Sequence, residues 1–123
     1  MKRILLTFVL LFTFICAQAA DISSISNAFK AGNANSISGN MGKEVDIAIP
    51  GSSKKCDGGE ATQILTSFFS SSKPSNFTVV HHADKKESGF MVGKLATSKG
   101  EFRVNITYKA EGNRAIIQSI RIE

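Results

Sequence analysis

The strictest constraint on the fold is an alternation of apolar and polar side chains over residues 101–109. Successive side chains of a strand point to opposite faces, so the segment predicts a strand with one buried and one wet face. Helices must then cover the buried face of the sheet to which this strand belongs. The predicted buried face carries Phe102, Val104, Ile106 and Tyr108, and the wet face carries Arg103, Asn105, Thr107 and Lys109.

The rest of the chain divides into a helical first half and a strand-rich second half. The best-marked helix begins near Asp57, which with Glu60 resembles a capping box, and it ends at Lys73 because Pro74 follows. Tight turns at residues 98–100 and 112–113 separate the last strands. This order predicts an α+β domain in which helices pack on a curved, mainly antiparallel sheet. We expect helices over 21–31, 35–41 and 57–72, and strands over 44–49, 76–82, 89–97, 101–109 and 115–123.

Two strands give explicit predictions for the direction of their side chains. In the first strand, Val45, Ile47 and Ile49 are expected to point inward. In the last strand, alternation divides the side chains between the two sides of the sheet. One side is expected to carry Ile116, Ile120 and Ile122, and the other Ile117, Ser119 and Arg121.

The first twenty residues have the pattern of an export signal. Lys2 and Arg3 precede an apolar run over residues 4–16, and residues 17–19 form an Ala-x-Ala cleavage site. The run is too short for a membrane span, and Ile15 before Cys16 argues against lipidation. We therefore expect cleavage after Ala19 or Ala20, a single domain over 21–123, and a location in the periplasm or outside the cell.

The charge of the mature chain argues against nucleic acid as a partner. The leader holds two of the fifteen basic residues and no acidic one, so the net charge of +5 falls by two on cleavage. Phosphate binding needs clustered cations. The lysine pairs at 54–55 and 85–86 are separate, and we interpret both as parts of solvated loops.

Cys56 is the one cysteine that remains after cleavage, so an internal disulfide is excluded. Two lysines precede it and a predicted helix follows it, and both features lower the pKa of a thiol. One hypothesis is therefore a reactive thiol or an intermolecular bridge. The other, which we prefer, is an inert loop cysteine.

The order of elements resembles the nuclear-transport-factor-two-like superfamily, which is also called cystatin-like. More closely, it is similar to a family of small exported bacterial proteins of unknown function. The resemblance spans nearly the whole mature chain and implies a cone-shaped fold and export, but no activity. The residues that carry it are Ile64-Leu65 through Phe68-Phe69, Phe77 through His81, Gly93-Lys94-Leu95, Phe102-Arg103-Val104 and Ile120-Arg121-Ile122.

The adjacent histidines His81 and His82 are the most obvious candidates for chemistry. Neighbours on a strand point apart, so the pair is poorly placed to bind one metal, and we expect neither metal nor cofactor. His81 shares a face with Phe77, which predicts that it points toward the helices and that His82 lies on the wetter face. Superfamily enzymes, by resemblance, use a His or carboxylate base with a Tyr donor in the cone. The catalytic candidates are then His81, Glu60 and Tyr108, although Glu60 is better explained as a helix cap.

Two functions remain open from the sequence. The preferred one is a non-catalytic binding module of the cell envelope, without membrane contact after cleavage. Its ligand is either a small apolar molecule in the cone or an envelope protein on the wetter sheet face, through which a homodimer is also expected. The alternative is a small lyase, isomerase or hydrolase that uses His81. Ligand candidates are His81, Phe77, Phe90 and Tyr108, and the predicted interaction face carries Arg103, Asn105, Thr107 and Arg121.

Overall fold

The structure is a computed structural model that describes residues 22–85 and 87–123 of the chain. The predicted signal segment over residues 1–20 and its cleavage site lie outside the described residues, as does Lys86. No helix in the described ranges is long and apolar enough to cross a membrane.

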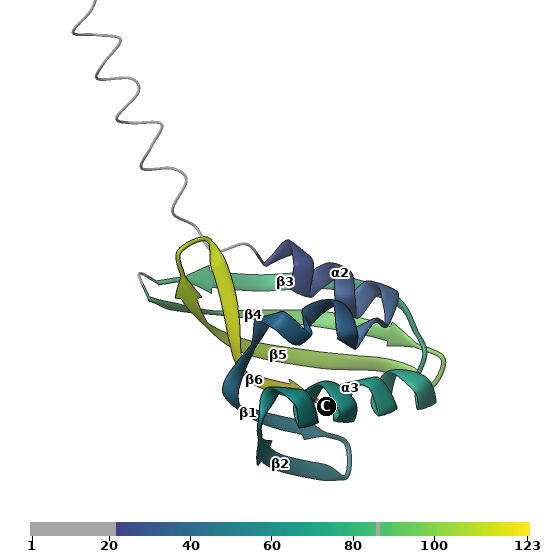
Figure 1. Cartoon of the computed structure of the whole chain (residues 1–123). Coiled ribbons are helices and arrows are strands. Elements are labelled where there is room, and N and C mark those ends of the chain that lie inside the picture. Colours follow the sequence, from purple (N-terminus) through teal and green to yellow (C-terminus); the bar gives the residue numbers. More distant parts are fainter. Residues whose placement is uncertain (1–21, 86) are drawn as a thin grey trace, which may run out of the picture.

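In the described part of the chain, three helices cover one face of a six-stranded sheet (Figure 1). They are α2 (Ser23–Ala31), the 3-10 helix η2 (Ala34–Asn40) and α3 (Gly58–Ser71). We call the covered face the inner face and the opposite one the outer face. The strands lie in the order β2-β1-β6-β5-β4-β3, with β1 parallel to β6 and all other neighbours antiparallel. They are β1 (Met41–Ile49), β2 (Ser52–Cys56), β3 (Pro74–Asp84), β4 (Ser88–Thr97), β5 (Gly100–Glu111) and β6 (Arg114–Ile122).

The predicted α+β class and the predicted order of elements are confirmed, apart from one additional strand. Lys54, Lys55 and Cys56 were expected in a loop, but they belong to β2, which pairs antiparallel with β1. Backbone pairing with β1 holds this polar strand, and its lysines add exposed ion pairs, since Lys54 contacts Glu60 and the Lys55 Nζ lies 3.5 Å from Glu44 Oε1. A search for apolar alternation does not detect a strand of this kind.

The predicted ends of the helices follow from local chemistry. The Asp57 side chain accepts a hydrogen bond from the Glu60 backbone N–H at 2.8 Å and so caps α3. The Glu60 side chain pairs with Lys54, so the reciprocal half of the predicted capping box is replaced by an ion pair. At the C-terminal end of α2, Gly32 adopts a left-handed conformation with φ of 67°, which favours glycine.

Aromatic side chains fill the space between the helices and the inner face. The Phe29 ring lies 5.4 Å from the Phe69 ring and 5.3 Å from the Phe77 ring, measured between centroids. Phe77 fits because Gly93, diagonal to it on β4, leaves room for its ring, and a Cβ atom there would be only 2.3 Å from the ring. Met91 and Tyr108 are at most 1% exposed and complete this packing. These side chains therefore fill the space between the inner face and the helices at this position.

A bulge in β3 overturns the predicted directions of the two histidines. Val79 pairs with Gly93 but His81 pairs with Val92, so Val80 is an extra residue in the strand. An extra residue inverts the alternation beyond it. His81 therefore lies opposite Val92 on the outer face, and His82 lies opposite the buried Met91 on the inner face. The prediction that His81 points toward the helices is wrong.

A second bulge inverts the predicted faces at the start of β6. Thr107 pairs with Ser119 whereas Tyr108 pairs with Ile117, so Gln118 is the extra residue. Ile117 is consequently buried with 0% exposure on the inner face, where Ile116 had been expected. Beyond the bulge the prediction is confirmed, because Ile120 and Ile122 are buried and Arg121 is exposed. In β1, Val45 and Ile47 are buried as predicted, and Ile49 packs against the core.

Candidate functional site

The inner face holds one polar cluster, at the end where β3, β4 and β5 lie side by side. The Tyr108 hydroxyl donates a hydrogen bond to the Asp84 carboxylate, and His82 Nδ1 lies 3.9 Å from the other carboxylate oxygen. Burial, and after it the bond to Asp84, raises the pKa of Tyr108 well above its usual range. The tyrosine is thus held as a neutral donor. Gly89 makes room for it, because a Cβ there would lie 2.6 Å from the Tyr108 hydroxyl oxygen.

The residues predicted for catalysis do not meet. His81 is exposed on the outer face, where its ring lies 5.5 Å from the ring of Phe90. Glu60 pairs with Lys54 at the start of α3, and Tyr108 lies on the inner face with Asp84 as its partner. The geometry does not assemble an acid–base pair from these three side chains.

The predicted ligand residues are also divided between the two faces. Phe77 is 5% exposed and Tyr108 is 1% exposed, so both belong to the core. His81 and Phe90 lie together on the outer face, since Phe90 pairs with the outward-facing Thr107. No common cavity can therefore be built from these four side chains.

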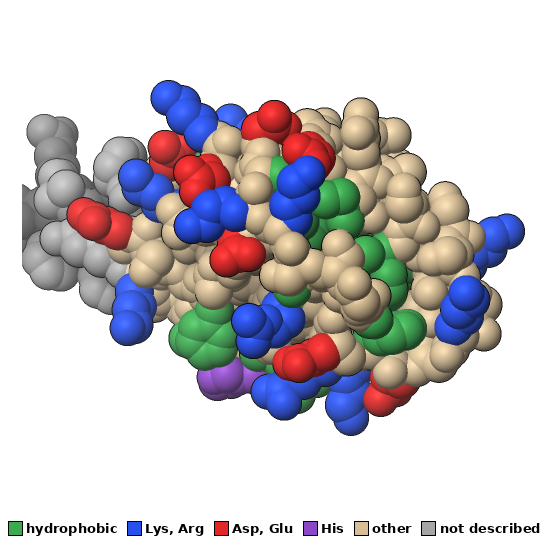
Figure 2. Space-filling view, turned by 90° about the horizontal axis from the view of Figure 1, so that it is seen from below, with side chains coloured by type: hydrophobic (Ala, Val, Ile, Leu, Met, Phe, Trp, Pro, Cys, Tyr) green, Lys and Arg blue, Asp and Glu red, His purple; other side chains and the backbone are tan. Residues whose placement is uncertain are grey.

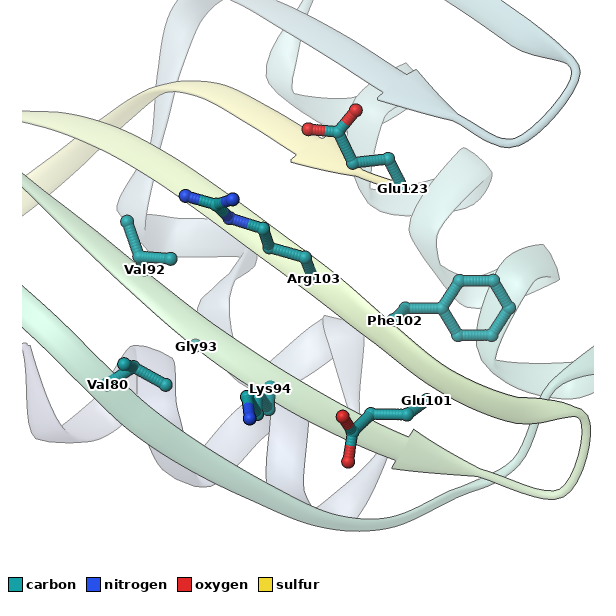
Figure 3. A pocket seen from close by; sticks show the side chains of 8 residues that line it. All are labelled: Val80, Val92, Gly93, Lys94, Glu101, Phe102, Arg103 and Glu123. Carbon is teal, nitrogen blue, oxygen red and sulfur yellow. The ribbon is translucent and has the colours of Figure 1, made fainter.

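The outer face carries a concave site, which we call the outer pocket. Its volume is about 440 Å³. Figure 3 shows Val80 and Val92 at one end of it, Arg103 and Lys94 in its middle, and the side chains of Glu101 and Glu123 at its borders. The Phe102 side chain points away toward the helices, where its ring lies 5.3 Å from that of Phe68. The pocket therefore offers an apolar end next to charges of both signs.

A second hollow of about 270 Å³ lies on the outer face between β1, β5 and β6. Thr107 and Ser119 both line it, and their hydroxyl groups are hydrogen-bonded to each other. Asn105 pairs with Arg121 on the same two strands, two residues away from the Thr107–Ser119 pair and therefore on the same face. The structure thus places Asn105, Thr107 and Arg121 together, and Arg103 in the neighbouring outer pocket, so all four residues of the predicted interaction face lie on the outer face.

The outer face combines exposed apolar side chains with balanced charge. Val80 is 57% exposed and Phe90 is 36% exposed, and these are the large apolar side chains that the described ranges present to solvent. Figure 2 views the molecule from below, from the end of the sheet where β2 lies, and shows positive and negative side chains interspersed with small hydrophobic areas on that side too. Such a surface favours neither a polyanion nor a polycation. The outward charges around the two hollows are Lys94, Arg103 and Arg121 against Asp46, Glu101 and Glu123.

The structure does not support an activated thiol at Cys56. The side chain is 8% exposed, and burial raises the pKa of its thiol, with the nearby Glu60 and Asp57 carboxylates acting in the same direction. Lys54 opposes them more weakly, and its ammonium group is already paired with Glu60. In the part of the chain that the structure describes, no group of three or more His, Cys, Asp or Glu side chains is arranged to hold a metal ion.

A family model of a domain of unknown function, DUF4783, matches residues 22–123. The chain belongs to the DUF4783 family. A solved DUF4783 structure from Bacteroides ovatus is 37% identical, covers 85% of this chain and 94% of its own, and has a TM-score of 0.78. One from Bacteroides uniformis is 36% identical, covers 82% and 94%, and also has a TM-score of 0.78. No curated protein matches the chain significantly.

More distant structures identify the fold of this DUF4783 protein. An NTF2-like protein of unknown function from Cytophaga hutchinsonii is 9% identical, covers 83% of this chain and 84% of its own, and has a TM-score of 0.57. At this identity the likeness concerns the fold alone. The predicted nuclear-transport-factor-two-like fold and the resemblance to a family of unknown function are confirmed.

Sequence reasoning for this DUF4783 chain missed most of the outer pocket. Val80, Val92 and Lys94, which line it, were not named as site residues. Phe90, which lies beside His81 on the same face and outside the pocket, was expected in the cone. The available signal was the pair Val79-Val80 followed by His81-His82, which interrupts the alternation. An interruption of this kind indicates a bulge, and bulges commonly re-aim side chains near functional sites.

Proposed function

We propose that this DUF4783 protein is an exported, non-catalytic binding module of the cell envelope that binds another protein through its outer sheet face. The observation that carries the proposal is the pair of exposed apolar side chains, Val80 and Phe90, on a face without helices. Exposed apolar groups surrounded by polar ones are typical of protein-binding surfaces.

The charge of this face supports a protein partner over other classes. Arg103 and Lys94 stand beside Glu101 and Glu123 around the outer pocket, so positive and negative groups alternate over short distances. A nucleic acid or an anionic membrane would favour a surface of one sign. A protein offers both signs and apolar side chains at once. The partner is either a second copy of the chain or another protein of the envelope.

The packed inner face argues against a small apolar ligand in the cone. The rings of Phe29, Phe69 and Phe77 occupy the space that such a ligand would need. The alternative, an enzyme that uses His81, has no support either. His81 is exposed on the outer face, whereas the polar cluster with His82 and Asp84 lies on the inner face and cannot serve as its acid–base partner.

Native mass spectrometry of the tagged protein, purified gently from the envelope of its own host, tests the proposal. We expect a mass above that of the cleaved monomer, owing to a bound protein. The Arg103→Glu variant should lose this partner, since it reverses a charge in the outer pocket. Lys30→Glu makes the same change on the exposed side of α2 and should retain it. A monomeric mass, or equal retention by both variants, would contradict the proposal.

A further inference from the structure

A pocket of about 340 Å³ lies on the inner side of the sheet, at the end where α3 stops, and we call it the end pocket. Its walls come from the last turn of α3, the turn between β1 and β2, and the turn between β4 and β5. Figure 1 shows these three segments at the same end of the sheet. The rings of Phe29, Phe69 and Phe77, which fill the centre of the core, do not line it. The end pocket is therefore separate from the filled part of the inner face.

The floor of the end pocket is apolar. The Phe68 and Phe102 rings meet edge to face with a centroid distance of 5.3 Å, and Ile49 and Pro50 line the side toward β1. A volume of about 340 Å³ has room for roughly ten non-hydrogen atoms, if each takes the space of a water molecule in the liquid. The size and the floor therefore suit a small molecule with an apolar chain or ring.

Ser72 brings an unused hydroxyl group to the end pocket. The residue is only 4% exposed, and within residues 22–85 and 87–123 its side chain makes no hydrogen bond. No unpartnered side-chain oxygen in these ranges is completely enclosed, so the Ser72 hydroxyl opens onto the pocket that this residue lines. A nearly buried hydroxyl without a partner favours a ligand that has a polar head.

Lys99 supplies a positive charge to the same pocket. Hydrogen bonds hold its turn, since the Lys99 N–H donates to Thr97 Oγ1 at 3.1 Å. The Ser98 N–H donates to the Lys73 carbonyl at 2.9 Å, which ties this turn to the chain that follows Ser72. In the described ranges no carboxylate forms an ion pair with Lys99. The carbonyl end of α3 contributes only about half a negative charge, so the full charge of the lysine outweighs it and favours an anion.

We propose that the end pocket binds a small carboxylate with an apolar chain. The chain lies against the Phe68 and Phe102 rings, and the carboxylate accepts a hydrogen bond from the Ser72 hydroxyl and pairs with Lys99. A neutral alcohol keeps the bond to Ser72 but loses the ion pair, and an ammonium head is repelled by Lys99. The site lies on the inner side of the sheet and does not depend on the protein partner proposed for the outer face.

Titration of the isotope-labelled protein, followed by the NMR shifts of its backbone amides, tests the inference. Hexanoate, hexanol and hexylammonium are the probes, because they have the same alkyl chain and differ in the charge of the head. We expect hexanoate to shift the amides of residues 67–72 and 98–102. It should bind roughly two- to fivefold more tightly than hexanol, as an exposed ion pair allows, and hexylammonium should bind most weakly.

Variants assign the binding to the end pocket, with circular dichroism as the check on folding. Lys99→Gln should weaken hexanoate roughly two- to fivefold and leave hexanol unchanged. Lys109→Gln is the matched control, because Lys109 is an exposed lysine near the opposite end of β5 and should change neither. Ser67→Phe should abolish the binding of both, since Ser67 is exposed and a ring there would fill the pocket. No binding of hexanoate, equal affinities for the three probes, equal effects of Lys99→Gln and Lys109→Gln, or shifts confined to other residues would each overturn the inference.

Discussion

The close contact between Gly93 and Phe77 predicts a strong dependence of stability on one missing methyl group. In Gly93→Ala, the new Cβ would lie 2.3 and 2.5 Å from two Phe77 ring carbons and 3.0 Å from the Thr78 carbonyl oxygen. The ring cannot move freely, because Phe29 packs against it with a centroid distance of 5.3 Å. Overpacking a core costs about 1–3 kcal/mol, and we expect about 2–3 kcal/mol here.

A double-mutant cycle isolates this contact. Phe77→Leu removes the outer ring atoms, so Gly93→Ala should cost less than about 1 kcal/mol in that background. The coupling energy between the two positions is then about 1–2 kcal/mol, within the range for residues in direct contact. Gly39→Ala serves as the control, because its new methyl group would meet no atom within 4 Å beyond its chain neighbours, and the φ of Gly39 is not positive.

Urea unfolding followed by circular dichroism measures these costs. The transition midpoint should fall in Gly93→Ala with the m-value unchanged, which indicates a change of stability rather than of the unfolded state. Gly39→Ala should stay within about 0.5 kcal/mol of the parent. A cost of Gly93→Ala that is equal in both backgrounds would refute the reasoning, because the Phe77 ring would then not be its cause.

Two further predictions concern ionisable groups. Tyr108 is the one tyrosine of the chain, so ultraviolet absorbance reads its ionisation directly. Its pKa is raised on folding, so its contribution to stability is complete below about pH 10 and is lost as the pH rises further. Tyr108→Phe should remove this alkaline loss, and a Tyr108 that ionises near pH 10 in the folded protein would contradict it. Cys56 is buried with a raised pKa, so iodoacetamide should alkylate it at neutral pH more slowly in the folded than in the unfolded protein. Equal rates would argue for an accessible thiol.

The parts of the fold that depend on regular periodicity could be predicted from the sequence. The alternation along β5 and the cap and apolar stripe of α3 are local signals, and both elements were placed correctly. β2 was missed because its exposed side chains show no apolar alternation, and it is held by backbone hydrogen bonds to β1. Local periodicity carries no information about them.

The candidate site was harder to predict, because one extra residue decides it. A bulge at Val80 exchanges the faces of His81 and His82, and its position depends on the pairing with β4 rather than on β3 alone. The outward direction of Asn105, Thr107 and Arg121 was predicted correctly, because the register between β5 and β6 is regular from Asn105 to Thr107. Their part in an interaction stays a prediction. The outer pocket adds side chains from β3 and β4, whose proximity follows from the sheet order.

The parallel pairing of β1 with β6 has a consequence for the time course of folding. Ile47 of β1 pairs with Ile120 of β6. The last strand of the chain, β6, therefore joins the β1–β2 hairpin to strands β3, β4 and β5. Closing so long a loop is entropically costly, and folds dominated by such contacts form slowly. We therefore expect the two halves of the sheet to remain unjoined until β6 is available. A growing chain therefore exposes unpaired edges of β1 and β5 until its last strand has been synthesised.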